Sequence, residues 1–169
     1  MSILAIKTYG DPCLRRKSED VKEVTPELLK LVNDMLETMY ANKGVGLAAP
    51  QVGINKNLLV VDVGDVLGKH ELVVLINPEM LSKEGTDFLE EGCLSCPKAS
   101  VRVKRAKKTV VQAINQKGEK IIREDSGFLS RAIQHEMDHL NGKLIIDSAG
   151  FFEKIKLKSK MKKRSQETG

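Results

Sequence analysis

Two segments of the chain carry hydrophobic residues at helical spacing. The first begins at Thr25-Pro26-Glu27, where a capping side chain, a first-turn proline and an acidic residue are typical of a helix N-terminus. Gly44 marks the C-terminal end of this predicted helix. Its hydrophobic positions are Leu28, Val32, Met35, Leu36 and Met39. We expect this face of the helix to pack on a core.

The second helical segment ends at Asn141-Gly142, and we expect Asp125 or Ser126 to cap its N-terminus. An α-helix turns by about 100° per residue, which sorts the side chains into arcs. The hydrophobic arc holds Leu129, Ile133, Met137 and Leu140. The adjoining arc holds Ala132, His135, Glu136 and His139. The histidine face therefore borders the core.

Shorter segments have the patterns of β-strands. Segments 58–61 and 72–76 are continuously hydrophobic and are joined through residues 64–70, and the second is expected to end at Asn77-Pro78. A further strand is expected within residues 80–89. Segments 101–104 and 109–114 alternate, and a hairpin turn at Lys117-Gly118 precedes Ile121-Ile122. The alternation predicts antiparallel strands with one face in water.

The remaining segments complete the predicted fold. Residues 1–24 are expected to be extended with a turn at 9–12, and residues 143–147 to form a short strand. A final helix from Ala149 is expected to dock weakly through Phe151, Phe152, Ile155 and Leu157. The pattern predicts a single α+β domain, with antiparallel or mixed sheets packed around a central helix, an N-terminal helix and a basic C-terminal helix.

Length and composition agree with one domain. The chain has 169 residues, of which 41% are hydrophobic, enough for a core without disulfides. We expect residues 1–147 to form the catalytic unit and residues 148–169 a basic tail that is not a separate domain. No run of 18 hydrophobic residues exists, and the N-terminus lacks the layout of a signal peptide. These features predict a cytoplasmic protein without a membrane span.

The net charge of +5 is concentrated near the C-terminus. Residues 151–169 hold seven basic and two acidic residues, so the rest of the chain is neutral overall. A basic tail on a neutral body fits contact with a polyanion such as RNA, and it equally fits a solvated tail. We expect a second group of basic residues to be solvated and not to bind DNA, because no aromatic residues lie among them. These residues are Lys104, Arg105, Lys107 and Lys108.

Metal chemistry is indicated by the segment 135–139. Four residues separate His135 from His139, so both imidazoles lie on one face of the helix, with Glu136 beside them. Neutral imidazole is a good ligand for Zn²⁺ or Fe²⁺, and an unligated glutamate can take a proton from water that the metal activates. A third protein ligand is required for a catalytic site with one open position.

The cysteines leave alternatives for that ligand. The chain has three, Cys13, Cys93 and Cys96, too few for a disulfide framework. We favour Cys93, whose thiolate would bind a metal strongly. If Cys96 also bound, the result would be a closed structural site in an RNA-associated module, although such a site has no need of Glu136. A redox Cys-x-x-Cys pair is a weaker alternative, because no βαβ context surrounds it.

The small residues 44–51 are expected to form a loop through which the backbone approaches a ligand. A phosphate loop is disfavoured, because no Lys-Ser or Lys-Thr follows the glycines. Together with segments 91–95 and 135–139, this loop resembles the three motifs of the peptide deformylase family, in the same order, and the likeness covers roughly residues 3–147. The chain departs from the family pattern at Cys96, where an aliphatic residue is commoner, and at Ser100, on the expected pocket rim.

The resemblance implies a metal-dependent hydrolase that removes the formyl group from the N-terminal formyl-methionine of new polypeptides. It implies one divalent metal held by Cys93, His135 and His139, with Fe²⁺ in the cell and Zn²⁺, Ni²⁺ or Co²⁺ in preparations. Glu136 would activate the metal-bound water. A general metalloendopeptidase is disfavoured, because the third ligand would be Cys93 and not Glu or His. The developing oxyanion would be held by the Gln51 amide and the Leu94 backbone N–H.

The resemblance also implies how the substrate is held. The backbone of Gly46 and of Glu91-Gly92 would pair with an extended peptide, which suits an enzyme that accepts many sequences. An apolar pocket for the methionine side chain would draw on Val45, Phe128, Leu129 and Ile133. The basic tail would bring the enzyme to ribosomal RNA, near the nascent chains on which it acts.

Overall fold

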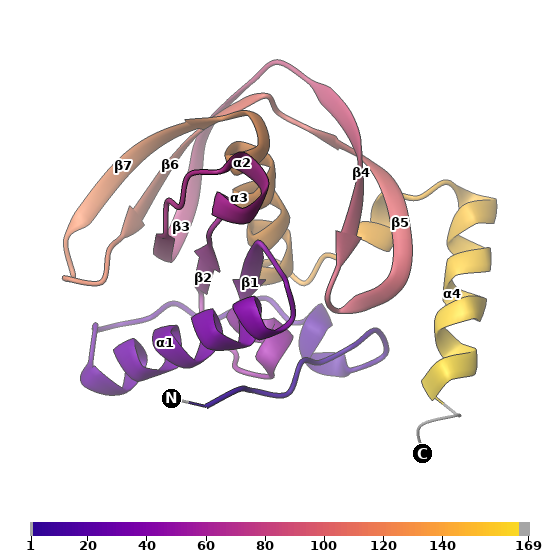
Figure 1. Ribbon diagram of the computed structural model, residues 1–169, viewed down its shortest axis with the longest axis horizontal. Helices are drawn as coiled ribbons and strands as arrows, with labels where there is room; N and C mark the ends of the chain where they lie inside the picture. The colour runs from indigo at the N-terminus through magenta and orange to yellow at the C-terminus, as the bar shows by residue number, and fades with distance from the viewer. Residues whose placement is uncertain (1, 166–169) are drawn as a thin grey trace.

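Helix α3 (Gly127–Leu140) lies at the centre of the molecule, between a five-stranded sheet and a two-stranded hairpin (Figure 1). The computed structural model describes residues 2–165. The hairpin consists of β4 (Asp87–Cys93) and β5 (Cys96–Arg105), and α4 (Phe151–Ser165) lies on its outer side (Figure 1). This arrangement confirms the predicted α+β class and the central position of the histidine-bearing helix.

All neighbouring strands of the larger sheet are antiparallel, in the order β1-β2-β3-β6-β7. Its strands are β1 (Gly46–Ala48), β2 (Leu58–Val61), β3 (Val73–Glu84), β6 (Lys108–Ile114) and β7 (Lys120–Ser126). Strand β2 is buried on both faces, since Leu58 and Val60 pack in one core cluster and Leu59 and Val61 in another. Burial on both faces explains why this strand is continuously hydrophobic.

Helix α1 (Pro26–Ala41) covers one face of this sheet, as its spacing predicted. The Leu28 backbone N–H donates to the Thr25 hydroxyl at 3.3 Å, which satisfies one of the free donors at the helix start. The short helix α2 (Gly64–Leu67) follows β2. Three short 3₁₀ helices complete the chain, at Pro12–Arg15, Ala49–Val52 and Ile145–Ser148.

A third core cluster joins the hairpin to the C-terminal segments. It contains Leu14, Cys96, Ala99, Val101, Val103, Leu144, Ile145, Ile146 and Met161. Helix α4 docks here through Leu157 and Met161. The expectation that the first turns would dock was wrong for Phe151, Phe152 and Ile155, which are exposed. Residues 166–169 of the predicted tail lie outside the described residues.

Several local predictions were wrong because contacts distant in sequence decide the conformation. Strand β3 continues through Asn77-Pro78, and Asn77 is held at a φ of 51° while its side chain bonds both backbone groups of Val21. Residues 145–148 form a 3₁₀ helix instead of a strand, and Asp147 there bonds Arg15 at 2.6 Å.

The loop expected at residues 44–51 contains β1 and the start of a 3₁₀ helix. Ser126 occupies the N-cap position of α3 without a side-chain cap, and Asp125 bonds Arg123. Among the described residues, no helix is both long enough and apolar enough to cross a membrane.

Candidate metal centre and active site

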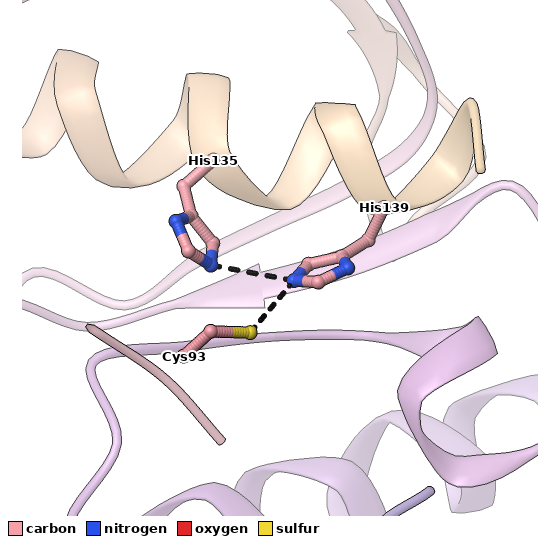
Figure 2. A group of neighbouring side chains, drawn as sticks. All are labelled: Cys93, His135 and His139. Carbon is pink, nitrogen blue, oxygen red and sulfur yellow. Dashed lines mark hydrogen bonds between the residues drawn. The ribbon is translucent and has the colours of Figure 1, made fainter. Parts of the chain in front are cut away.

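Three side chains that could ligate a metal converge where the end of β4 faces α3 (Figure 2). His135 and His139 lie one turn apart on the helix, with their Nε2 atoms 3.3 Å apart. The Cys93 Sγ lies 3.2 Å from the His139 Nε2. Their candidate ligand atoms all lie within 4.8 Å of one another, and Cys96 is not part of this group. The geometry therefore offers three ligands, as expected for a catalytic site.

The Glu91 carboxylate fixes the orientation of the first histidine. The His135 Nδ1 donates to it at 2.9 Å, which leaves Nε2 for a metal. Arg105 donates two hydrogen bonds to the same carboxylate, at 3.0 and 2.9 Å, and Arg131 donates a third at 2.7 Å. Burial opposes ionisation, but the bonds from His135 and Arg105 outweigh it and lower the pKa of Glu91 to about 2. Glu91 therefore remains a charged acceptor.

The position of Arg105 corrects a prediction from the sequence. It was expected to be a solvated charge, yet it is 7% exposed and bonds both Glu91 and Asp138. Arg105 follows the buried Val101 and Val103 at two-residue spacing in β5, which places the three residues on one face of the strand. This spacing could have predicted that Arg105 is buried. The role of the Glu91 side chain was also missed, because only its backbone was considered.

Arg131 and Gln134 are two further buried polar residues of α3 that the sequence reading missed. Gln134 donates to the Ala106 carbonyl at 2.9 Å and accepts from its N–H at 3.0 Å, which joins α3 to the end of the hairpin. Their place on the helix, four and one residues before His135, was the available signal.

Glu136 lies beside the three candidate ligands and bonds none of them. It is 4% exposed, and within the described part of the chain its Oε2 has no hydrogen-bond partner. Burial raises the pKa of this carboxyl to about 7. A divalent cation nearby would lower that pKa and favour the charged form. The carboxylate is thus free to exchange a proton with a molecule in the site.

The donor set fits a divalent cation. Burial lowers the pKa of His139 well below its usual value, so this imidazole is neutral, as a ligand must be. Hydrogen bonding with Cys96 and burial raise the pKa of the Cys93 thiol, whereas coordination to a metal would deprotonate it. One thiolate and two neutral imidazoles suit Zn²⁺ and Fe²⁺ equally.

A cavity of about 380 Å³ opens onto Cys93, His135 and Glu136, while the buried His139 lies outside its lining. The residues expected at the substrate site that line it are Val45, Gly46, Glu91, Gly92, Leu94 and Phe128. Leu129 and Ile133 do not line it: Leu129 packs against a core cluster and Ile133 is fully buried within that cluster. Ser100 is also absent from the lining and donates to Glu90 at 2.7 Å.

Gln51 enters the cavity in a defined orientation. Its Oε1 accepts from the Ala48 backbone N–H at 2.8 Å, so the amide nitrogen points toward the site. That nitrogen lies 3.2 Å from the Ser95 hydroxyl and 3.7 Å from the Cys93 sulfur. The side chain therefore presents an N–H donor beside the candidate metal ligands.

Comparison with known proteins identifies the family. The model of the polypeptide deformylase family matches residues 3–154. The chain belongs to the polypeptide deformylase family. It is 50% identical over 147 residues to a peptide deformylase from Halothermothrix orenii, a match that covers 87% of this chain and 94% of its relative.

Solved deformylase structures agree over nearly the whole chain. The crystal structure of a peptide deformylase from Legionella pneumophila matches with a TM-score of 0.91 and 38% identity, covering 99% of this chain and 98% of the other. A deformylase from Ehrlichia chaffeensis in complex with actinonin matches with a TM-score of 0.92 and 38% identity, covering 97% of this chain and 98% of the other. The fold and family predicted from the three motifs are confirmed.

Proposed function

We propose that Cys93, His135 and His139 hold the metal of this deformylase and that Glu136 moves the proton of its reaction. As a member of the family, the chain is a metal-dependent hydrolase that removes the N-formyl group from new polypeptides. The observation that carries the assignment of roles is the convergence of three candidate ligand atoms beside a buried, unligated carboxylate, at a cavity that Cys93, His135 and Glu136 line.

The side chains divide the reaction between them. Cys93, His135 and His139 would hold a divalent metal, which would supply Lewis acidity toward the formyl group and water. Glu136 accepts a proton from the attacking water and then delivers it to the departing amine. The Gln51 amide and the Leu94 backbone N–H donate to the oxyanion that develops on the formyl group, a contribution of about 3 kcal/mol per donor in other hydrolases.

Backbone pairing would hold the peptide. Among the described strands, β1 lies at the edge of its sheet, and β4 has only β5 as a partner. Gly46 of β1 and Glu91-Gly92 of β4 line the same cavity. Pairing through such edges reads the main chain and tolerates varied side chains. Val45 and Phe128, also at the lining, suit the methionine side chain.

We expect Fe²⁺ in the cell, with Zn²⁺, Ni²⁺ or Co²⁺ as replacements in preparations, since the same ligands suit several metals. Protein purified without oxygen should contain about one divalent metal per chain and hydrolyse formyl-Met-Ala. A chelator should remove both metal and activity, and Fe²⁺ should restore both. Full activity in metal-free protein would refute the assignment of the metal site.

We further propose that helix α4 is an extension of the catalytic unit that brings it to ribosomal RNA in the cytoplasm. Lys156, Lys160 and Lys162 are exposed, while Leu157 and Met161 attach the helix to the core. Changing these three lysines to glutamine should weaken binding to ribosomes at low salt without detaching the helix. The slope of the logarithm of the binding constant against the logarithm of the salt concentration should also become shallower, by about 0.7–0.9 for each lost phosphate contact.

Co-sedimentation with ribosomes at several salt concentrations measures this effect. A matched control changes three exposed lysines elsewhere, Lys17, Lys22 and Lys117, to glutamine, which lowers the net charge equally. Equal weakening in both variants would show that overall charge acts and that α4 has no special role.

A further inference from the structure

Two cysteines face each other across the turn that joins the hairpin strands. Cys93 is the last residue of β4, Cys96 is the first of β5, and the two are direct partners in the register. Partners in an antiparallel pair have Cα atoms about 4.5 or 5.5 Å apart, within the range of about 4.4–6.8 Å at which disulfides form.

We propose that Cys96 is a resolving cysteine, which forms a disulfide with Cys93 when a peroxide oxidises the metal site. This inference rests on the proposed role of Cys93 as a metal ligand. The disulfide would convert damage at the ligand into a reversible loss of metal. It would also give Cys96 a function at a position where packing alone has no need of sulfur.

Access to solvent determines which thiol reacts first. Cys93 lines the cavity through which small molecules reach the site. Cys96 is 1% exposed and lies behind it, in the core cluster with Val101 and Ile146. A peroxide that enters the cavity therefore meets the sulfur of Cys93, and Cys96 approaches that sulfur from the protein side.

The chemistry balances with one peroxide and two thiols. The Cys93 sulfur attacks the peroxide, so that an S–O bond forms, the O–O bond breaks and one water leaves, giving a sulfenic acid. The Cys96 sulfur then attacks the Cys93 sulfur, so that an S–S bond forms, the S–O bond breaks and a second water leaves. Each thiol loses one proton and one electron. Without a resolving thiol, more peroxide takes the sulfenic acid to sulfinic acid, which ordinary thiols do not reduce.

Disulfide formation would dismantle the donor set. The Cys93 sulfur lies 3.2 Å from the His139 Nε2, and it provides the only thiolate in the group of three ligands among the described residues. A disulfide sulfur carries no negative charge, and two imidazoles alone bind a divalent metal weakly. Metal release should therefore accompany oxidation, and reduction with added metal should reverse it.

The third cysteine provides a matched control. Cys13 packs against the same core cluster, but it lies on a 3₁₀ helix, and its thiol donates to the Pro50 carbonyl at 3.4 Å. Burial, the hydrogen bond to Asp11 and the charge of that residue raise the pKa of the Cys13 thiol to about 11. Cys13 is therefore a half-buried sulfur that packs against the same cluster without a cross-strand partner.

The test exposes the metal-loaded enzyme to hydrogen peroxide and follows bound metal and the oxidation state of each cysteine by peptide mass spectrometry. In the unaltered chain and in Cys13→Ser, the peptide that holds Cys93 and Cys96 should lose the mass of two hydrogen atoms as metal is released. Dithiothreitol and fresh metal should restore metal content. In Cys96→Val, Cys93 should instead gain two oxygen atoms, and the metal content should not recover.

The outcomes separate this inference from the proposed function. Sulfinic acid on Cys93 of the unaltered chain, without a disulfide to Cys96, would overturn the inference, and so would equal recovery of metal in Cys96→Val. A Cys93–Cys96 disulfide that forms while the metal stays bound would instead refute Cys93 as a ligand. Peptide mapping of the unaltered chain shows whether Cys93 forms the disulfide or the sulfinic acid, even if Cys96→Val folds poorly.

Discussion

Replacing Glu136 with glutamine is expected to lower the rate constant of deformylation by about 10²- to 10⁴-fold, the usual contribution of a general acid or base. Glutamine keeps the shape of the side chain but cannot accept and return a proton. The three candidate metal ligands do not bond Glu136, so the metal content should be unchanged. Initial rates with formyl-Met-Ala and metal analysis of the same sample measure the two effects.

The thermal unfolding of Glu136→Gln is its control. The carboxylate is buried and its Oε2 unpaired, so a neutral amide should leave the unfolding temperature unchanged or raise it slightly. Activity within a few-fold of the unaltered enzyme, with metal and fold intact, would remove Glu136 from the proton transfer. Lost metal would instead make it a ligand.

The second large effect is expected at Glu91, where glutamine should lower the free energy of unfolding by about 3–5 kcal/mol. The change removes the charge on which Arg105 and Arg131 converge, and Arg131 then lacks a charged partner among the described residues. It also weakens the acceptor that orients His135, so metal affinity should fall by about 10- to 100-fold. Urea unfolding and competition with a chelator measure these quantities.

The neighbouring Glu90 offers a matched control for stability. It is exposed and accepts a hydrogen bond from Ser100 at 2.7 Å, so Glu90→Gln should change the unfolding free energy by less than about 0.5 kcal/mol. Similar losses in both variants would mean that charge on β4, rather than the buried network, governs stability.

Local signals predicted the regular elements and failed where distant contacts act. The spacing and caps of α1 and α3 identified both helices, and alternation identified β5 and β6. Asn77-Pro78 is ordinarily a strand end, yet β3 continues because the Asn77 side chain bonds the backbone of Val21, 56 residues away. No local pattern contains that contact.

In the candidate site, too, the sequence predicted the residues of one element better than the contacts between elements. The four-residue spacing of His135 and His139 was sufficient to place both rings on one face, because one helix carries them. The third ligand and the Gln51 amide come from other elements: Cys93 was favoured for the chemistry of its thiolate, with a closed site that includes Cys96 left open, and the role of Gln51 came from the family motifs. The network around Glu91 requires two arginines from β5 and α3, so it became visible only when the chain was folded.

Gly46 links substrate recognition to chemistry through the space that its missing side chain leaves. Its φ lies outside the left-handed region, so the backbone there would accept other residues. A Cβ atom at this position, however, would lie 2.8 Å from the Cγ and 2.9 Å from the Cδ of Glu136. An alanine at residue 46 would therefore keep the strand conformation but displace the carboxylate that we propose to move the proton, so this glycine serves the position of Glu136 rather than the conformation of the strand.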